Sequence, residues 1–256
     1  MSTTSDHADV ITVAGHDLVA DLIGRRSFTE MIHLVLTGGR EPDPAHVTMV
    51  DALLVTFTDH GVTPSSMAAR LTLLGAPEAL QAAVAAGLCG AGSRFLGTLE
   101  NSASVLNEAL QDVAEDAELA PVADGVVAAA RAERSTVVGI GHPEHKNGDP
   151  RVPCLLELAD SLKLRGRHTD LLLELPAALT RAGGPSLPVN AAGLAGALIA
   201  DMGYGPAFAR GIAVISRAAG LVGQLLDEER APVARRMWDR ERTEPTKPLG
   251  TKSEKK

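Results

Sequence analysis

The sequence predicts an all-α protein. Its 256 residues fall into about ten segments in which apolar residues recur every three to four positions. Capping residues and glycine or proline stops separate these segments, and few stretches alternate apolar with polar residues as strands do. Hydrophobic residues make up 45% of the chain and aromatic residues only 2%, so small aliphatic side chains must fill the core and let helices pack closely.

Capping signals define the first helices. Ser27 and Glu30 fit a capping box, and the apolar run after them stops at a pair of glycines. Each of the next two predicted helices begins with a polar cap followed by proline, which is favoured in the first helical turn. The three predicted helices cover residues 27–38, 43–61 and 63–75.

The rest of the chain continues this pattern. Helices are predicted at residues 76–91, 101–117, 121–133, 150–164, 169–182, 190–202 and 206–230. Two glycine-rich junctions, 88–97 and 183–193, are candidate hinges between a larger body and a smaller lobe. The segment 243–256 is rich in Pro, Lys and Glu with almost nothing apolar, so we expect a disordered tail.

Composition and charge exclude several classes of function. A net charge of −8 gives no basic field for DNA or an anionic membrane, and the scarcity of aromatic residues disfavours stacking on single-stranded nucleic acid. Cys89 and Cys154 lie in apolar segments, so core packing is expected rather than a disulfide. The N-terminus does not resemble a signal peptide, and no uninterrupted apolar run reaches about 20 residues. We expect a cytoplasmic protein without a membrane span.

The stretch from Gly139 to Arg151 carries the densest chemistry: Gly-Ile-Gly-His-Pro-Glu-His-Lys-Asn-Gly-Asp-Pro-Arg. The glycines let backbone N–H groups approach a ligand, and His142 could donate a proton to a substrate oxygen or take one from it. Lys146 on the turn suits a phosphate, although such a lysine is usually solvated. Arg151 falls in a first helical turn, where a cation is unfavourable, which hints at a nearby anion.

Plainer interpretations compete with these. His142 could be a loop histidine without a task, and Asp149-Pro150 reads as a helix cap with a structural role only. His142 and His145 could suggest a metal, but Pro143 between them disfavours a regular helix that presents both, and no metal is expected. Arg217 lies in an otherwise apolar helix and needs a partner, which could be an internal salt bridge or a substrate carboxylate.

These residues resemble the citrate synthase superfamily. Residues 139–151 match its Gly-x-Gly-His pattern followed by Lys-Asn-x-Asp-Pro-Arg, and Ser216-Arg217-Ala218-x-Gly220 resembles its C-terminal arginine motif. Asp59-His60-Gly61 and the stretch from Asp17 to Gly39 resemble earlier elements, so the resemblance extends to about residue 240. Citrate synthases carry a catalytic histidine where Phe95 falls. The segment 92–97 instead resembles the citryl-CoA lyase branch, which includes the lyase module of ATP-citrate lyase.

The resemblance implies a homodimer with a large helical domain, residues 1–97 and 190–242, and a small one, residues 98–189. The cleft would take a CoA thioester and a carboxylate substrate, with coenzyme A as part of the substrate. His142 would face the oxygen at the cleaved carbon, and Arg235 or Arg236 could reach across the dimer. The implied substrate-binding residues are Arg151, Arg217, His60, Phe95 and Arg236, and the implied CoA-binding residues are Gly139, Ile140, Gly141, Lys146 and Asn147.

One departure from the family pattern bears on the chemistry. The family has Asn-Val-Asp where this chain has Asn190-Ala191-Ala192, and the family aspartate handles the proton at the thioester α-carbon. Two other carboxylates could be considered as replacements for this aspartate. Asp201 falls on about the opposite helix face and is a poor substitute, whereas Glu144 lies closer to His142 in sequence and could serve. A positioned acid or base contributes about 10²–10⁴-fold in rate, or about 3–5.5 kcal/mol. Pro143, where many relatives have arginine, is a second departure.

The leading hypothesis is therefore a citryl-CoA lyase-like enzyme that cleaves a 3-hydroxy-3-carboxyacyl-CoA to an acyl-CoA and a 2-oxo acid such as oxaloacetate. His142 would remove the hydroxyl proton as the bond breaks. One alternative is condensation on the same scaffold, of the citrate or methylcitrate synthase type, which the absence of His at 95 and Asp at 192 disfavours. Another is a non-catalytic relative that binds CoA or a partner, which Ala192 supports.

Overall fold

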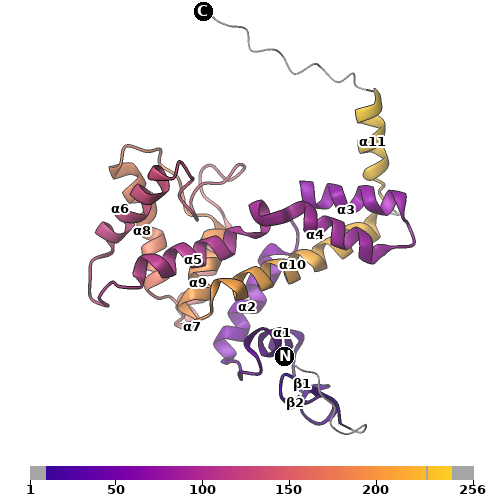
Figure 1. Ribbon diagram of the computed structural model, residues 1–256, viewed down its shortest axis with the longest axis horizontal. Helices are drawn as coiled ribbons and strands as arrows, with labels where there is room; N and C mark the ends of the chain where they lie inside the picture. The colour runs from indigo at the N-terminus through magenta and orange to yellow at the C-terminus, as the bar shows by residue number, and fades with distance from the viewer. Residues whose placement is uncertain (1–9, 229, 244–256) are drawn as a thin grey trace, which may run out of the picture. The chain divides into compact units, whose positions relative to one another are not determined.

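A computed structural model describes residues 10–228 and 230–243 of the chain (Figure 1). The described residues form eleven α-helices and a two-stranded hairpin of two residues per strand, which confirms the predicted all-α class. The elements are β1 (Thr12–Val13), β2 (His16–Asp17), a π-helical turn η1 (Leu18–Leu22), α1 (Phe28–Thr37), α2 (Pro44–Phe57), α3 (Pro64–Gly75), α4 (Leu80–Leu96), α5 (Thr98–Leu110), α6 (Leu119–Ala132), α7 (Arg151–Leu162), α8 (Arg167–Arg181), α9 (Ala191–Asp201), α10 (Pro206–Asp227) and α11 (Ala234–Thr243).

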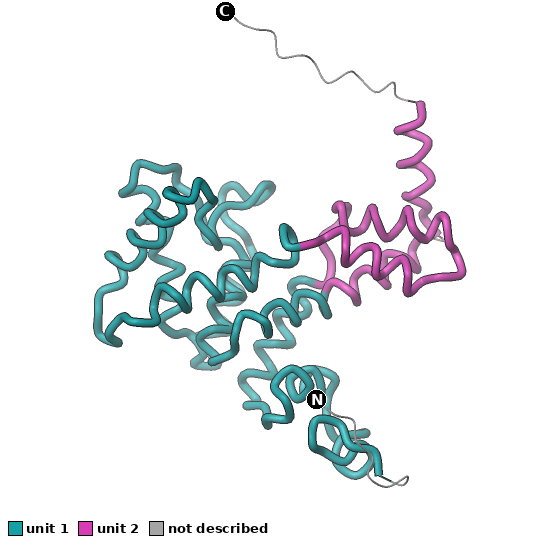
Figure 2. The backbone as a smooth tube through the Cα atoms, in the orientation of Figure 1, with its two compact units in different colours: residues 1–57, 93–216 teal, residues 58–92, 217–256 magenta. Residues whose placement is uncertain are grey.

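The helices group into two compact units (Figure 2). The first comprises the described residues up to Phe57 together with Ser93–Ser216. The second comprises Thr58–Gly92 and the described residues from Arg217 onward. The large and small domains implied by the resemblance, with boundaries after residues 97 and 189, stay a prediction.

The core of the first unit centres on α9, which packs against α5 and α8, while α6 packs on α8. Nearly every side chain of α9 is buried because the helix consists of Ala, Gly, Leu and Ile almost throughout. Gly196 shows why small residues are needed there, since a Cβ at this position would lie 2.5 Å from the Leu99 carbonyl oxygen on α5. Helices of this composition can approach each other backbone to backbone, as predicted.

The second unit is built from α3, the part of α4 up to Gly92, the C-terminal part of α10, and α11, which packs on α3. Its core contains Ala69, Ala83, Leu221 and Leu225. Helix α11 was not predicted; its residues 234–243 are mostly charged, and only Ala234 among them is buried.

Local capping accounts for the helix starts. The capping box of Ser27 and Glu30 is present, Thr63 forms a second one before α3, and the Asp43 carboxylate accepts a hydrogen bond from the Ala45 amide at 2.7 Å. The predicted end of α2 near Gly61 is wrong. The helix stops at Phe57, because the Asp59 side chain turns the backbone by accepting hydrogen bonds from the amides of residues 60 and 61.

Three further sequence predictions can be compared with the structure. Cys89 and Cys154 are free as expected, but both are exposed, so their assignment to the core was wrong. Of the predicted disordered tail only Thr243 is described, as the last residue of α11, and residues 244–256 lie outside the described residues. The helical stretch Leu80–Leu110 has the length and apolar composition of a membrane span. Core helices of soluble proteins share these properties, so this stretch is weak evidence for a membrane span.

Candidate active site

The predicted motif begins at an isolated β-bridge in the first unit, at residues 139–141. The Gly141 amide donates to the Pro188 carbonyl oxygen at 2.7 Å, and the Asn190 amide donates to the Gly139 carbonyl oxygen at 2.9 Å. Between them Ile140 and Val189 form an antiparallel bridge. Residues some fifty positions apart in sequence are thereby joined, and the loop that follows Gly141 starts beside the N-terminus of α9.

This junction requires glycine on both sides. Gly139 has a left-handed backbone with φ +77°, and a Cβ on Gly193 would lie 2.6 Å from the Gly139 carbonyl oxygen. Asn190 reinforces the contact through both ends of its amide. Its Oδ1 accepts from the Gly193 amide at 2.8 Å as the cap of α9, and its Nδ2 donates to the Gly141 carbonyl oxygen at 2.7 Å. Asn190 therefore fastens the glycine loop to the helix.

The backbone of its own loop holds the His142 ring. Its Nδ1 accepts hydrogen bonds from the amides of Glu144 and His145, both at 3.1 Å. An imidazole nitrogen that accepts from two N–H donors carries no proton, so the neutral ring has its proton on Nε2. The ring also stacks on His145, with centroids 4.5 Å apart. In this state His142 presents an N–H donor at Nε2 and cannot act there as a base.

Arg151 begins α7 and is held by a neighbouring carboxylate. Its Nε donates to Asp149 Oδ1 at 2.9 Å and its Nη2 to Asp149 Oδ2 at 2.8 Å. Asp149 Oδ2 also accepts from the Ala191 amide at 3.0 Å, at the first residue of α9. Burial alone would raise the pKa of Asp149, but the hydrogen bonds from Arg151 and Ala191 outweigh it and hold this pKa well below its usual range.

Asp149 caps the start of α7 as predicted, since its Oδ1 accepts from the Arg151 amide at 3.1 Å, but it does not serve only as a cap. Its carboxylate also binds the Arg151 side chain and the Ala191 amide. The sequence contains no signal for this role, because the contact with Ala191 depends on two segments meeting in the fold. The same is true of Asn190, whose hydrogen bond to the Gly141 carbonyl was not predicted from the sequence.

The five residues expected to bind CoA divide into two groups. Gly139, Ile140 and Gly141 form the bridged strand, where Ile140 is buried and the Gly141 amide and Gly139 carbonyl are already paired with residues 188–190. Lys146 and Asn147 lie on an exposed turn in which the Lys146 amide donates to the Glu144 carbonyl oxygen at 3.1 Å. The exposed polar groups that could meet a phosphate come from this turn.

Arg217 and His60 belong to the second unit. Arg217 is half-buried on α10, and the desolvation of its guanidinium lowers its pKa while the charge of Asp59 acts against this. The Asp59 carboxylate is bonded to the Gln224 side chain and to the amides of His60 and Gly61. Arg217 therefore lies near a carboxylate, which leaves both predicted roles open, an internal ion pair or a carboxylate clamp.

Two more predicted residues are exposed. Phe95 lies near the end of α4 in the first unit with 49% of its surface exposed, and Arg236 is an exposed residue of α11 in the second unit. Within the first unit the structure gathers His142, Arg151 and the glycine strand around the start of α9. The roles assigned to Phe95, Arg217, His60 and Arg236 stay predictions.

The two carboxylates considered from the sequence, Asp201 and Glu144, lie away from the side chain of Ala192 or are held by other contacts. Ala192 is half-buried in the first turn of α9. Asp201, at the other end of this helix, accepts hydrogen bonds from the amides of Gly166, His168 and Thr169 and so caps α8. Glu144 is exposed, and it contacts His142 through its backbone amide.

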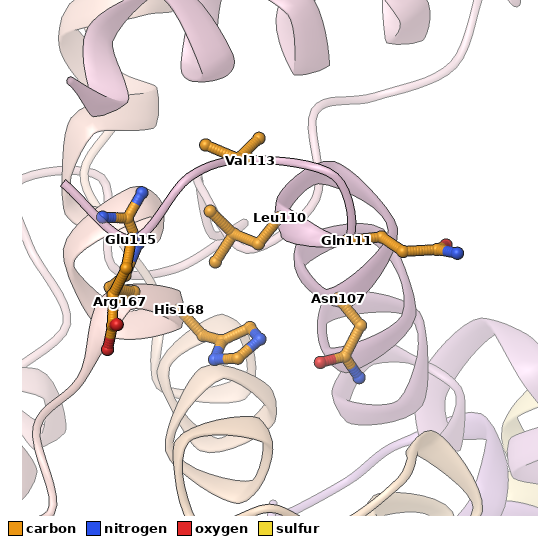
Figure 3. Close-up of a pocket in the computed structure, with 7 residues that line it drawn as sticks. All are labelled: Asn107, Leu110, Gln111, Val113, Glu115, Arg167 and His168. Carbon is orange, nitrogen blue, oxygen red and sulfur yellow. The ribbon is translucent and has the colours of Figure 1, made fainter. Parts of the chain in front are cut away.

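The part of the chain that the structure describes contains no cluster of three or more His, Cys, Asp or Glu side chains suited to a metal. A separate open cavity of about 360 Å³ lies near the N-terminus of α8 (Figure 3). His168 lines it and contacts Asp201 through Nδ1 at 2.9 Å, with Arg167 beside it and Asn107 contributed by α5. We assign no function to this cavity, since Asp201 already satisfies the helix end there.

The chain is similar to a described protein family and to curated proteins. The family description "Citrate synthase, C-terminal domain" matches residues 7–237. A citrate synthase of Acidithiobacillus ferridurans is 25% identical over 193 residues, which cover 73% of this chain and 48% of that protein. "Putative citrate synthase 2" of Mycobacterium tuberculosis is 30% identical over 122 residues, 48% of this chain and 31% of that protein. The chain thus spans about half or less of the length of these curated relatives.

Solved structures share the fold. Citryl-CoA lyase from Hydrogenobacter thermophilus superimposes with a TM-score of 0.79 at 28% identity, covering 90% of this chain and 87% of that one. ATP citrate lyase from Methanosaeta concilii, in complex with (3S)-citryl-CoA, gives a TM-score of 0.72 at 23% identity over 90% of this chain and 39% of that one. The fold predicted from the sequence is thereby confirmed, and the chain belongs to the citrate synthase family.

Proposed function

We propose that this protein is a citryl-CoA lyase-type enzyme that cleaves a 3-hydroxy-3-carboxyacyl-CoA into an acyl-CoA and a 2-oxo acid such as oxaloacetate. The similarity to citryl-CoA lyase along most of both chains supports a lyase, and so does Phe95 where synthases have histidine. The observation that carries the proposal is that one segment presents a fixed N–H donor, His142 on the loop, and a fixed cation, Arg151 at the start of α7. Such a pair suits a substrate that has an oxygen and a carboxylate on the same carbon.

His142 acts in this proposal as a hydrogen-bond donor. Cleavage passes the hydroxyl proton to water, turns the C–O bond into a carbonyl and sends the electron pair of the C–C bond to the thioester as an enolate, which takes a proton back from water. The Nε2–H group of His142 stabilises the negative charge on the oxygen at the cleaved carbon. This differs from the sequence-based expectation that His142 removes the hydroxyl proton, because two backbone amides keep Nδ1 an acceptor.

The remaining assignments follow the family resemblance. Arg151 and Arg217 bind substrate carboxylates, with His60, Phe95 and Arg236 lining the substrate site. The glycine strand 139–141 and the turn of Lys146 and Asn147 meet coenzyme A, which is part of the substrate. We also propose a homodimer in the cytoplasm, a large and a small domain divided after residues 97 and 189, and a reaction that requires no metal.

Ala192 supports two alternatives. Without the family aspartate the protein could be a relative that binds CoA but no longer catalyses a reaction of the CoA thioester. The same scaffold could instead run the condensation of an acyl-CoA with oxaloacetate, which Phe95 and Ala192 disfavour. These functions differ in their products, so one set of assays separates them.

The test is to incubate the purified protein with citryl-CoA, and separately with acetyl-CoA and oxaloacetate, and to follow products by mass spectrometry. We expect acetyl-CoA and oxaloacetate from citryl-CoA, and a rate at least about 100-fold lower for His142→Ala, because a donor in an oxyanion position is worth about 10²–10³-fold. His145→Ala removes the ring stacked on His142 but keeps the backbone amide that reaches His142 Nδ1, so it separates loss of the donor from loss of ring packing.

Two results would contradict the proposal. CoA binding without turnover of either substrate set would identify a non-catalytic relative. Turnover that His142→Ala leaves unchanged would show that the donor on this loop takes no part in the reaction.

A further inference from the structure

Asp149 lies where three parts of the first unit meet: the end of the His142 loop, the start of α7 and the start of α9. Only 1% of its side chain is exposed, and the carboxylate accepts four hydrogen bonds. Three come from Arg151, through the backbone amide at 3.1 Å, Nε at 2.9 Å and Nη2 at 2.8 Å, and one comes from the Ala191 amide at 3.0 Å. A simple helix cap needs fewer hydrogen bonds than this carboxylate accepts.

The geometry of the pair decides which edge of the guanidinium is offered to a ligand. Asp149 occupies the edge formed by Nε and Nη2. A guanidinium has five N–H donors in a rigid fork, so the end formed by Nη1 and the second Nη2 hydrogen is directed away from Asp149. That end can meet a carboxylate with two parallel hydrogen bonds, and 28% of the Arg151 side chain is exposed.

The second contact of Asp149 ties this arginine to α9. Oδ2 accepts from Nη2 of Arg151 and from the amide of Ala191, the residue before Ala192. Arg151 is therefore held at a set distance from the turn where the family aspartate would stand. A charge in this place that is buried and saturated with donors stays ionised across the physiological range, as the strongly lowered pKa of Asp149 indicates.

We propose that Asp149 is the positioning residue of the carboxylate-binding site. It fixes which edge of the Arg151 guanidinium receives the substrate carboxylate, and it fixes the position of that edge relative to the start of α9. This inference rests on the proposed function, in which Arg151 binds that carboxylate. Asp149 itself makes no contact with substrate and acts through Arg151. The pair is thus a preorganised anion receptor, and rotation of the arginine would misplace the substrate relative to His142.

The test uses Asp149→Asn, which keeps the shape but replaces one acceptor oxygen by an N–H₂ group that faces existing donors. Binding of oxaloacetate and of coenzyme A is measured separately by calorimetry on the full-length protein. We expect oxaloacetate to bind about 10- to 100-fold more weakly while CoA affinity stays within about twofold. The chain offers a matched control in Asp201→Asn, a carboxylate with 2% side-chain exposure that caps α8 and should leave both affinities unchanged.

A double-mutant cycle shows whether Asp149 acts through the arginine. We expect Asp149→Asn to cause no further loss of oxaloacetate affinity in an Arg151→Ala background, because the group it positions is gone. If Asp149→Asn does not fold, Arg151→Lys provides the second test. Lysine keeps the charge but cannot form the fork, so it should show the same selective loss.

Several outcomes overturn the inference alone. Asp149→Asn could bind oxaloacetate as the parent protein does, or more tightly, in which case Asp149 is irrelevant to the ligand or competes with it. Additive losses in the cycle, an equal loss in Asp201→Asn, or unchanged affinity in Arg151→Lys would indicate a general structural role. If the parent protein binds no oxaloacetate and cleaves no citryl-CoA, the proposed function fails and the inference fails with it.

Discussion

Replacing Gly193 by alanine tests the junction on which the candidate site is built. The Cβ added by this substitution would lie 2.6 Å from the Gly139 carbonyl oxygen and closer still to its Cα. Both neighbours are backbone atoms, so no side chain can rotate away to make room. The strand 139–141 or the start of α9 must move by several tenths of an ångström, since real Cβ atoms stay beyond 3.0 Å.

The expected cost follows from the hydrogen bonds that cross this junction. The Asn190 amide reaches the Gly139 carbonyl at 2.9 Å, the Asn190 side chain reaches the Gly141 carbonyl at 2.7 Å, and Ser102 Oγ donates to the Gly193 carbonyl at 2.9 Å. Overpacking typically costs 1–3 kcal/mol, and each weakened hydrogen bond adds up to about 1 kcal/mol. We expect the free energy of unfolding to fall by about 2–4 kcal/mol.

Urea denaturation followed by circular dichroism measures this difference. Gly125→Ala is the matched control, because Gly125 is an exposed residue inside α6 with no atom within 4 Å of the added Cβ. Alanine there should stabilise the protein by about 0.5–1 kcal/mol, since glycine is a poor helix former. A free energy of unfolding for Gly193→Ala within about 0.5 kcal/mol of the parent protein would mean that the close backbone contact does not constrain this junction.

Three other predictions concern stability and turnover. Burial lowers the pKa of His33 and His46 below their ordinary value of 6.5, so the unfolded chain binds more protons below that pH, and the free energy of unfolding should fall as the pH drops from about 6.5; a flat profile from pH 5 to 7 in urea titrations would contradict this. Tyr204→Phe removes the hydroxyl that contacts His33 Nε2 at 2.6 Å and His46 Nδ1 at 2.7 Å, and should cost about 1–3 kcal/mol by the same titration, whereas an unchanged midpoint would mean that the buried ring does not need this partner. Ala192→Asp should raise citryl-CoA cleavage by about 10²-fold or more in steady-state assays if the site lacks only the family acid or base, and a fall in rate would mean that alanine belongs to a different mechanism.

The helices were predicted well where their signals are local. Ser27 caps α1 as its sequence pattern indicates, because the capping box needs only residues within one turn. The end of α2 was predicted wrongly because the Asp59 side chain competes with the helix for backbone amides. The predicted helix 101–117 instead covers Thr98–Leu110, and α11 was missed because its mostly charged residues carry little apolar periodicity.

Cys89 and Cys154 illustrate a second kind of error. Both lie among apolar residues in the sequence, yet both are exposed in the structure. Apolar neighbours in sequence do not determine which face of a helix a residue occupies, nor which of those faces another helix covers. Burial of a given side chain is decided by the packing partner.

The all-α class, the family and the segment that carries His142 and Arg151 could be predicted from residues close together in the chain, because periodicity, capping and a contiguous motif are local properties. The chemical capacity of these groups, in contrast, depends on how the chain folds. Two backbone amides make His142 a donor, and a contact between residues 149 and 191 turns a predicted helix cap into the anchor of Arg151. Such roles depend on hydrogen bonds whose partners meet only when distant segments pack together.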